Sequence, residues 1–166
     1  MAKAAATHFL QMLWCTEQFP AVTLRLFMTY GPGRGDQRFL PQIIRGCLQG
    51  RRFPVSEGRQ LRDFCYVDDA VECMLRALDA PAVCGRVINL ASGNPVTIRA
   101  VIEQVRDIIG HGQPEFGHIP YRASENMALW ADTTLARELM GWGSLVPLKE
   151  GLARKVEYYG GKESAL

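Results

Sequence analysis

The stretch RQLRDFCYVDDAV, residues 59–71, places two charged residues directly before an apolar run. Phe64, Cys65, Tyr66 and Val67 follow Arg62 and Asp63, so the pattern predicts a buried strand that passes into a helix. Neighbouring residues of a strand point to opposite faces, so Asp63 is not placed to neutralise Arg62. We therefore expect an anion site at Arg62, at the end of a strand, and a structural role for Asp63 in holding a loop or a helix end.

Outward from this stretch, apolar strands alternate with amphipathic helices, which predicts an α/β fold. Helices are expected near residues 1–19, 39–48, 68–78, 97–109, 133–141 and 148–159, with Asp68 or Asp69, then Thr97, then Asp132 or Thr133 as caps. Strands are expected near residues 21–27, 51–56, 61–67 and 85–91, with glycine-rich loops at 29–38 and 92–96. A doubly wound sheet normally begins with a strand, and this pattern begins with an apolar helix. We read residues 1–166 as a single fragment.

Composition restricts the function further. The chain has 166 residues, 48% of them hydrophobic, and a net charge of +2, which fits one globular domain and argues against nucleic-acid binding. Five cysteines without CxxC spacing and three scattered histidines argue against a metal site or a disulfide framework. No apolar run reaches transmembrane length. We expect a cytoplasmic protein with reduced thiols that binds no membrane, metal or nucleic acid.

Several segments together resemble the extended short-chain dehydrogenase/reductase family, the NAD-dependent nucleotide-sugar epimerases and dehydratases. The segments occur in the family's order and cover nearly the whole chain: LRLFMTYGPG, GRQLRDFCYVDDAV, GRVINLASGNPVTI, IPYRASENMALWADTTLARELMGW and PLKEGLARKVEYY. The resemblance implies the C-terminal part of a Rossmann-type doubly wound sheet together with a small α/β substrate-binding subdomain. It implies that the NAD-binding half of such an enzyme is absent.

The resemblance also implies the residues of a catalytic and cofactor site. MAKAAATHF matches the segment that begins at the family's Tyr-x-x-x-Lys pair, with Lys3 as the catalytic, cofactor-contacting lysine and the tyrosine two places before Met1. Tyr30, Gly31 and Pro32 would bring backbone close to the nicotinamide. No G-x-G-x-x-G follows a strand. The complete enzyme is expected to use NAD or NADP, and this chain alone to bind neither.

For the substrate, the resemblance implies contacts from Arg62, Arg122, Glu125, Val55 and Met28. A guanidinium offers a fork of donors that matches phosphate oxygens; the competing interpretation of Arg62 is a surface ion pair. Arg122 opens Arg-Ala-Ser-Glu where the family has Arg-Pro-Gly-Asp, so it could equally be a solvated loop arginine. Met28 replaces a common asparagine and can only pack, which indicates a lost contact or a different sugar.

The resulting hypothesis is the substrate-binding part of a nucleotide-sugar epimerase/dehydratase that binds the nucleotide diphosphate. Two alternatives stay open: a non-catalytic nucleotide- or partner-binding module, and one chain of a split enzyme. The sugar, the base and the choice between epimerisation, dehydration and reduction also stay open. Residues 4–14 are too apolar to remain exposed, so a homo-oligomer through this helix is expected.

Overall fold

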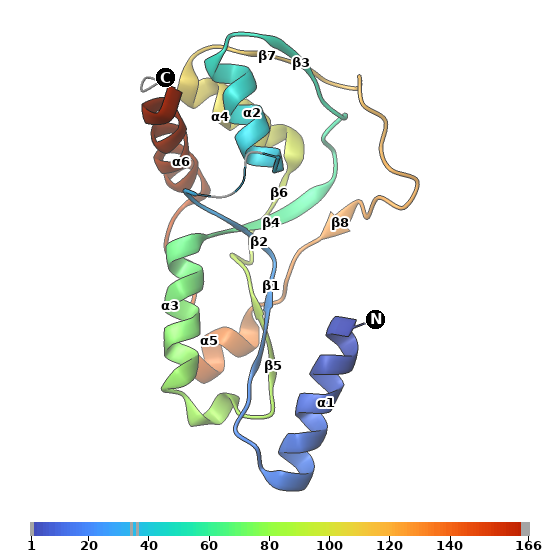
Figure 1. Cartoon of the computed structure of the whole chain (residues 1–166), viewed down its shortest axis with the longest axis vertical. Coiled ribbons are helices and arrows are strands. Elements are labelled where there is room, and N and C mark those ends of the chain that lie inside the picture. Colours follow the sequence, from blue (N-terminus) through green and yellow to red (C-terminus); the bar gives the residue numbers. More distant parts are fainter. Residues whose placement is uncertain (1, 34, 36, 164–166) are drawn as a thin grey trace.

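The computed structural model describes residues 2–33, 35 and 37–163, and shows an elongated, mixed α/β molecule. Three layers follow its long axis in Figure 1. Helices α2, α4 and α6 gather at the upper end of this view, and helices α1, α3 and α5 at the lower end. Strand β4 lies between them, in the middle layer. The α/β class expected from the sequence is confirmed.

The elements follow one another as in the expected alternation. The helices are α1 (Ala2–Glu17), α2 (Phe39–Leu48), α3 (Val67–Leu78), the 3-10 turn η1 (Pro81–Val83), α4 (Ile98–Ile109), α5 (Thr134–Met140) and α6 (Leu148–Glu163). The strands are β1 (Thr23–Leu26), β2 (Met28–Tyr30), β3 (Arg52–Pro54), β4 (Leu61–Tyr66), β5 (Val87–Leu90), β6 (Pro95–Thr97), β7 (Gln113–Glu115) and β8 (Ala128–Leu129).

The lower layer is built on a parallel pair of strands. β1 pairs with β5, with Thr23 opposite Val87 and Leu26 opposite Leu90. Its buried core combines β5 with the end of β4, one face of α3, η1 and the α5 region: Cys65, Ala70, Cys73, Ala77, Val83, Ile88, Leu90, Ala136 and Trp142. The indole of Trp142 donates a hydrogen bond to the carbonyl oxygen of Asp69 at 3.1 Å, which ties the end of α5 to the start of α3.

The middle layer is centred on β4. This strand pairs in parallel with β2 and β8 and antiparallel with β6. Met28 lies opposite Phe64, and Arg62 lies opposite both Val96 and Leu129. Four of the expected family segments therefore meet on a single six-residue strand.

The upper layer packs three helices around a second core, with the β3–β7 pair at its edge. α4 supplies the buried residues Ile98, Val101, Ile102 and Val105. The expected Thr97 cap is confirmed, because its hydroxyl accepts a hydrogen bond from the Ala100 N–H at 3.1 Å. Gly110 ends the helix in the left-handed conformation at φ 85°.

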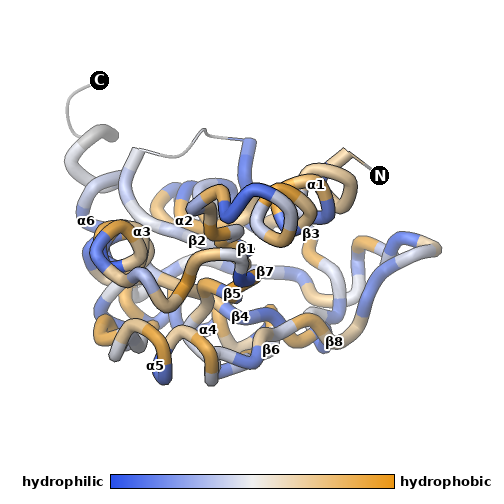
Figure 2. Tube along the Cα trace, turned by 90° about the horizontal axis from the view of Figure 1, so that it is seen from below, coloured by the Kyte–Doolittle hydropathy of each residue, from blue (hydrophilic) through white to orange (hydrophobic). Residues whose placement is uncertain are grey.

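Helix α1 differs from α4 in burial. Thr7 is its one buried residue among those described, and Phe9 and Met12 are 56% and 50% exposed. Figure 2 shows a largely apolar or neutral α1 beside the lower sheet. Its C-terminal end is held at the 83–86 turn, where Trp14 packs so closely on Gly85 that a Cβ there would lie 2.2 Å from the indole.

Two local expectations were wrong. The cap of α3 is Tyr66, without a side-chain hydrogen bond; Asp68 and Asp69 lie inside the first turn, because Asp69 bonds to a distant loop instead. The loops expected near 29–38 and 92–96 each overlap a short strand, β2 and β6, whose extended conformation comes from pairing with β4.

Candidate functional site

The two faces of β4 carry different chemistry. Asp63 is fully buried, and its carboxylate accepts hydrogen bonds from the backbone N–H and the hydroxyl of Ser92 at 2.8 and 2.7 Å and from the Gly93 N–H at 3.0 Å. These contacts close the loop between β5 and β6. The structural role expected for Asp63 is confirmed, and Asp63 does not neutralise Arg62.

Arg62, on the opposite face, holds an ion pair. One terminal nitrogen donates to the Leu61 carbonyl oxygen at 2.7 Å, and the other donates to the carboxylate of Glu125. The side chains of Arg62 and Glu125 are 12% and 22% exposed. The structure thus joins two of the expected substrate residues and leaves the guanidinium partly open to solvent.

Glu125 belongs to a long connection between β7 and β8, residues 116–127, which we call the arm; Figure 1 shows it projecting beside β4. Besides the Arg62–Glu125 contact, the arm is held by hydrogen bonds from Ile119 N–H to the Val55 carbonyl at 3.1 Å, from Arg59 N–H to the Tyr121 hydroxyl at 3.0 Å, and from Leu61 N–H to the Met127 carbonyl at 2.8 Å. Val55 itself is buried. The carbonyl oxygen of this buried residue therefore anchors the arm to the core.

Arg122 lies on the arm with its side chain exposed. The Glu125 N–H donates to the Arg122 carbonyl oxygen at 2.9 Å. The turn thus forms without the family's Pro-Gly pair, since Ala and Ser are compatible with a type I turn. This turn directs Glu125 onto Arg62.

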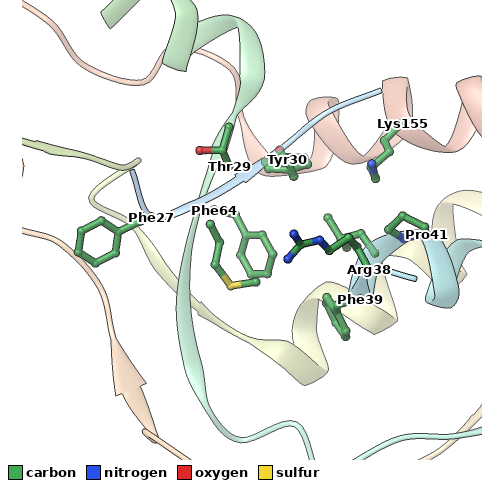
Figure 3. Close-up of a pocket in the computed structure, with 10 residues that line it drawn as sticks. Phe27, Thr29, Tyr30, Arg38, Phe39, Pro41, Phe64 and Lys155 are labelled. Atoms are coloured by element: carbon green, nitrogen blue, oxygen red, sulfur yellow. The ribbon is translucent and has the colours of Figure 1, made fainter. Parts of the chain in front are cut away.

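A pocket of about 330 Å³ opens beside β2 and the start of α2, and we call it the β2–α2 pocket. This volume is within the range of small-molecule sites, about 300–1,000 Å³. Figure 3 shows side chains from β2, β4, α2 and α6 converging on it. Its described lining is Phe27, Met28, Thr29, Tyr30, Arg38, Phe39, Leu40, Pro41, Phe64 and Lys155.

Two cations of this pocket were not found from the sequence. Lys155 on α6 is 1% exposed, and its ammonium donates to the Gly31 carbonyl oxygen and lies 5.3 Å from the centre of the Tyr159 ring. Arg38 is exposed and precedes α2. The available signal for Lys155 was a charged residue at helical spacing between Leu152 and Tyr159, which face the core.

Helix α6 also fixes the end of β2. The Tyr30 hydroxyl donates to the Leu148 carbonyl oxygen at 3.2 Å. Gly151 permits this approach, because a Cβ there would lie 2.2 Å from that hydroxyl oxygen. Together with Lys155, these contacts clamp the turn at Tyr30 and Gly31 against the helix.

The expected cofactor residues are not gathered into one open surface. Tyr30 and Gly31 are buried, while Pro32 and Lys3 are exposed. Burial, with the neighbouring Tyr66 second, raises the pKa of Tyr30 above its usual value, so its hydroxyl is not suited to proton transfer. The side chain of Tyr30 faces α6, and the approach of the backbone at Tyr30, Gly31 and Pro32 to a nicotinamide stays a prediction.

Within the described ranges, no group of three or more His, Cys, Asp or Glu side chains could hold a metal ion. Among those same residues, no helix has both the length and the apolar character needed to cross a membrane.

Comparison with known proteins gives concordant matches. Residues 1–91 match the NAD dependent epimerase/dehydratase family. A UDP-glucose 4-epimerase of Mycolicibacterium smegmatis is 31% identical over 138 residues, which are 80% of this chain and 43% of that protein.

Solved structures extend the match. The UDP-glucose 4-epimerase of Thermotoga maritima, solved with UDP-glucose, superposes with a TM-score of 0.89 at 26% identity, over 98% of this chain and 53% of that one. The UDP-glucuronic acid 4-epimerase of Bacillus cereus, in complex with UDP-glucuronic acid and NAD, gives a TM-score of 0.83 at 26% identity, over 93% of this chain and 50% of the other. The chain spans about half the length of these relatives.

Proposed function

The chain belongs to the NAD dependent epimerase/dehydratase family, and from this premise we propose that it is the part of such an enzyme that binds the nucleotide sugar, with Arg62 binding the diphosphate. The observation that carries the proposal is the Arg62–Glu125 pair. A guanidinium that already holds a carboxylate at a partly open strand face has the geometry to hold a phosphate.

The surroundings of Arg62 support this role. Arg122 lies on the arm three residues before Glu125, and its exposed side chain is available for a second phosphate oxygen. Phe64 lies on the same face of β4 as Arg62 and lines the β2–α2 pocket. A nucleotide sugar placed with its diphosphate at Arg62 therefore has an adjoining cavity for another of its groups. The Thermotoga and Bacillus cereus relatives were solved with UDP-sugars.

The diphosphate role is tested with UDP. Losing a hydrogen bond to a charged group costs about 1.5–3 kcal/mol, so Arg62→Ala should weaken UDP binding roughly ten- to a hundredfold in calorimetric titration. Arg106→Ala is the matched control, because Arg106 pairs with Asp107 on the outer side of α4. Equal affinities of the wild type and Arg62→Ala would remove Arg62 from the site.

Catalysis is proposed for the complete enzyme only, with NAD or NADP supplying hydride transfer. Lys3 is assigned there as the partner of a catalytic tyrosine and as a contact to the cofactor. Purified chain alone should neither bind NAD tightly nor convert a nucleotide sugar. Adding a separate NAD-binding half should restore turnover with wild-type Lys3, whereas full activity with Lys3→Ala would remove the lysine from this role.

A role in association is favoured by the surface of α1. The exposed side chains of Phe9 and Met12 form an apolar surface that residues 4–14 offer to another chain, and we assign it to a homo-oligomer. Phe9→Glu should dissociate the oligomer in light scattering. Leu78→Glu is the control, because Leu78 is 82% exposed on another helix. A wild-type monomer at micromolar concentration would contradict this assignment.

A further inference from the structure

Arg99, in the first turn of α4, joins two segments that lead to Arg62. Its Nε donates a hydrogen bond to the Glu57 carbonyl oxygen at 3.1 Å, and a terminal nitrogen donates to the Glu57 carboxylate at 3.0 Å. The guanidinium carbon also lies 3.7 Å from the centre of the Phe116 ring. One side chain thus connects residues 55–59, which we call the 55–59 segment, with the first residue of the arm.

The helix itself does not account for an arginine at this position. Thr97 is the N-cap of α4, so Arg99 is the second residue of the helix. The positive end of the helix dipole lies there and disfavours a cation. The contacts of the guanidinium outside the helix, a charge-assisted pair with Glu57 and a cation–π contact with Phe116, offset this cost.

The packing around Arg99 fixes the path of the arm. The Arg99 N–H donates to the Gly58 carbonyl oxygen at 2.8 Å. The backbone of the arm then passes so close to Glu57 that a Cβ at Gly117 would lie 2.5 Å from the Glu57 carboxylate. The direction in which the arm leaves α4 therefore depends on where Arg99 holds the Glu57 side chain.

The contacts continue from Arg99 to the ion pair of Arg62. The Arg59 N–H donates to the Tyr121 hydroxyl at 3.0 Å, and further along the arm Glu125 pairs with Arg62. Figure 1 shows the arm beside β4, next to the connection that leads from β3 into β4. A displacement at Arg99 therefore changes the separation of the two segments that border Arg62.

The direction of β4 decides which part of a nucleotide sugar these segments meet. Phe64, which lines the β2–α2 pocket, follows Arg62 on the strand, whereas the 55–59 segment precedes the strand. With the diphosphate at Arg62 and the sugar toward the pocket, the nucleoside lies toward the 55–59 segment and the arm. Pyrophosphate has no nucleoside, so its binding at Arg62 depends much less on their separation.

We propose that Arg99 is a positioning residue for the nucleotide. It acts through Glu57 and Phe116, and holds the arm and the 55–59 segment at the separation that UDP requires, without touching the ligand. The inference rests on the proposed function, in which Arg62 binds the diphosphate.

The test compares UDP with pyrophosphate in calorimetric titrations of the full chain. Because the Arg99 and Glu57 side chains are 36% and 41% exposed, Arg99→Met should weaken UDP binding about fivefold, the scale of a partly exposed ion pair, and pyrophosphate binding by less than about twofold. Arg99→Lys keeps the charge but not the fork of donors, so it should recover part of the UDP affinity. Arg106→Met, on the outer side of the same helix, is the matched control and should keep both affinities.

The route of the effect is tested with Glu57. Glu57→Ala should lower the UDP affinity in the same way as Arg99→Met. The double variant should bind UDP no more weakly than the weaker single variant, because the effects of partners in one contact do not add. Additive losses would show that Arg99 acts by another route and would overturn the inference.

The Arg62→Ala variant separates the possible failures. If it loses affinity for both ligands while Arg99→Met keeps the wild-type ratio of UDP to pyrophosphate affinity, the positioning role is overturned and the proposed function stands. A common loss for both ligands in Arg99→Met leaves this ratio unchanged, and so assigns Arg99 to the fold alone. If Arg99→Met does not fold, the same ratio is measured on Arg99→Lys. Unchanged affinities in Arg62→Ala, or a wild type that does not bind UDP, refute the proposed function and the inference with it.

Discussion

The two faces of β4 place neighbouring charges in opposite roles. Asp63 is fully buried and bonds to a loop 29 and 30 residues away, whereas Arg62 is partly exposed and holds a carboxylate on the arm. The hydrogen bonds of Asp63 join parts of the folded chain to one another and involve no ligand. We propose that the contact of Arg62 with Glu125 can be exchanged for a phosphate. A charge at a strand end must therefore be classed by its face and its partner before it is assigned to ligand binding.

The largest expected effect is on the buried face. Asp63→Asn keeps the size of the side chain but replaces one acceptor with a donor that faces the N–H groups of Ser92 and Gly93. The free energy of unfolding should fall by about 3 kcal/mol, the cost of leaving buried polar groups unsatisfied. Urea denaturation measures it, with the exposed Asp107→Asn as control. An unchanged free energy of unfolding would show that the fold does not depend on the Asp63 carboxylate, contrary to the contrast drawn between the two faces.

Cys65, on the same face as Asp63, offers a pH-dependent probe. Burial raises the pKa of its thiol from 9.0 to about 12, with Asp69 the next cause. Below about pH 9 the thiol is neutral in the folded and in the unfolded chain, so its contribution to stability is fully present. Between about pH 9 and 12 the unfolded chain ionises and the folded chain does not, so stability falls by up to about 1.4 kcal/mol per pH unit.

The check is urea denaturation of wild type and Cys65→Ala at pH 7.5 and pH 10. The stability advantage of the wild type over the variant should shrink at the higher pH. A constant difference would indicate that Cys65 is accessible to hydroxide. Thiol labelling at pH 8 sharpens the result, because the exposed Cys15 should react before Cys65.

The smallest effect is expected on the open face. A diphosphate must displace Glu125 from Arg62 or bind beside its negative charge. Glu125→Gln removes that charge and should tighten UDP binding up to about fivefold, within the range of a partly exposed ion pair. Glu115→Gln, which breaks the 3.6 Å pair with Arg52, is the control. Weaker binding would instead make Glu125 a direct substrate contact, the role that the family resemblance implies.

The sequence predicted the long helices and the buried strands, because their apolar periodicity is local. The bounds of α2 and the Thr97 cap of α4 agree with the expectation. β8 is only two residues long, and its conformation comes from pairing with β4, which no local pattern records. The cap of α3 was missed for a similar reason: Asp69 is taken by Ser144, Leu145 and Val146.

The residues of the candidate site also differ in whether the sequence could predict them. Arg62 and Glu125 could be named because each lies within a recognisable motif. Lys155 could not, because its contact with Gly31 spans 124 positions of the chain and depends on how α6 packs on β2. The charge of the β2–α2 pocket is a property of tertiary packing, and no single segment contains it.

The bonds of Asp69 have a consequence for the order of events during synthesis. Its carboxylate accepts from Ser144, Leu145 and Val146, which follow it by 75 to 77 residues. At roughly 5–20 residues per second, a ribosome needs several seconds to deliver these partners after Asp69 has left it. Until then α3 can form, but the Asp69 carboxylate in its first turn lacks these three partners and stays hydrated. Completion of the lower core is thus timed by the last quarter of the chain, and a nascent chain stalled before residue 144 would expose the face of α3 that Trp142 covers in the finished protein.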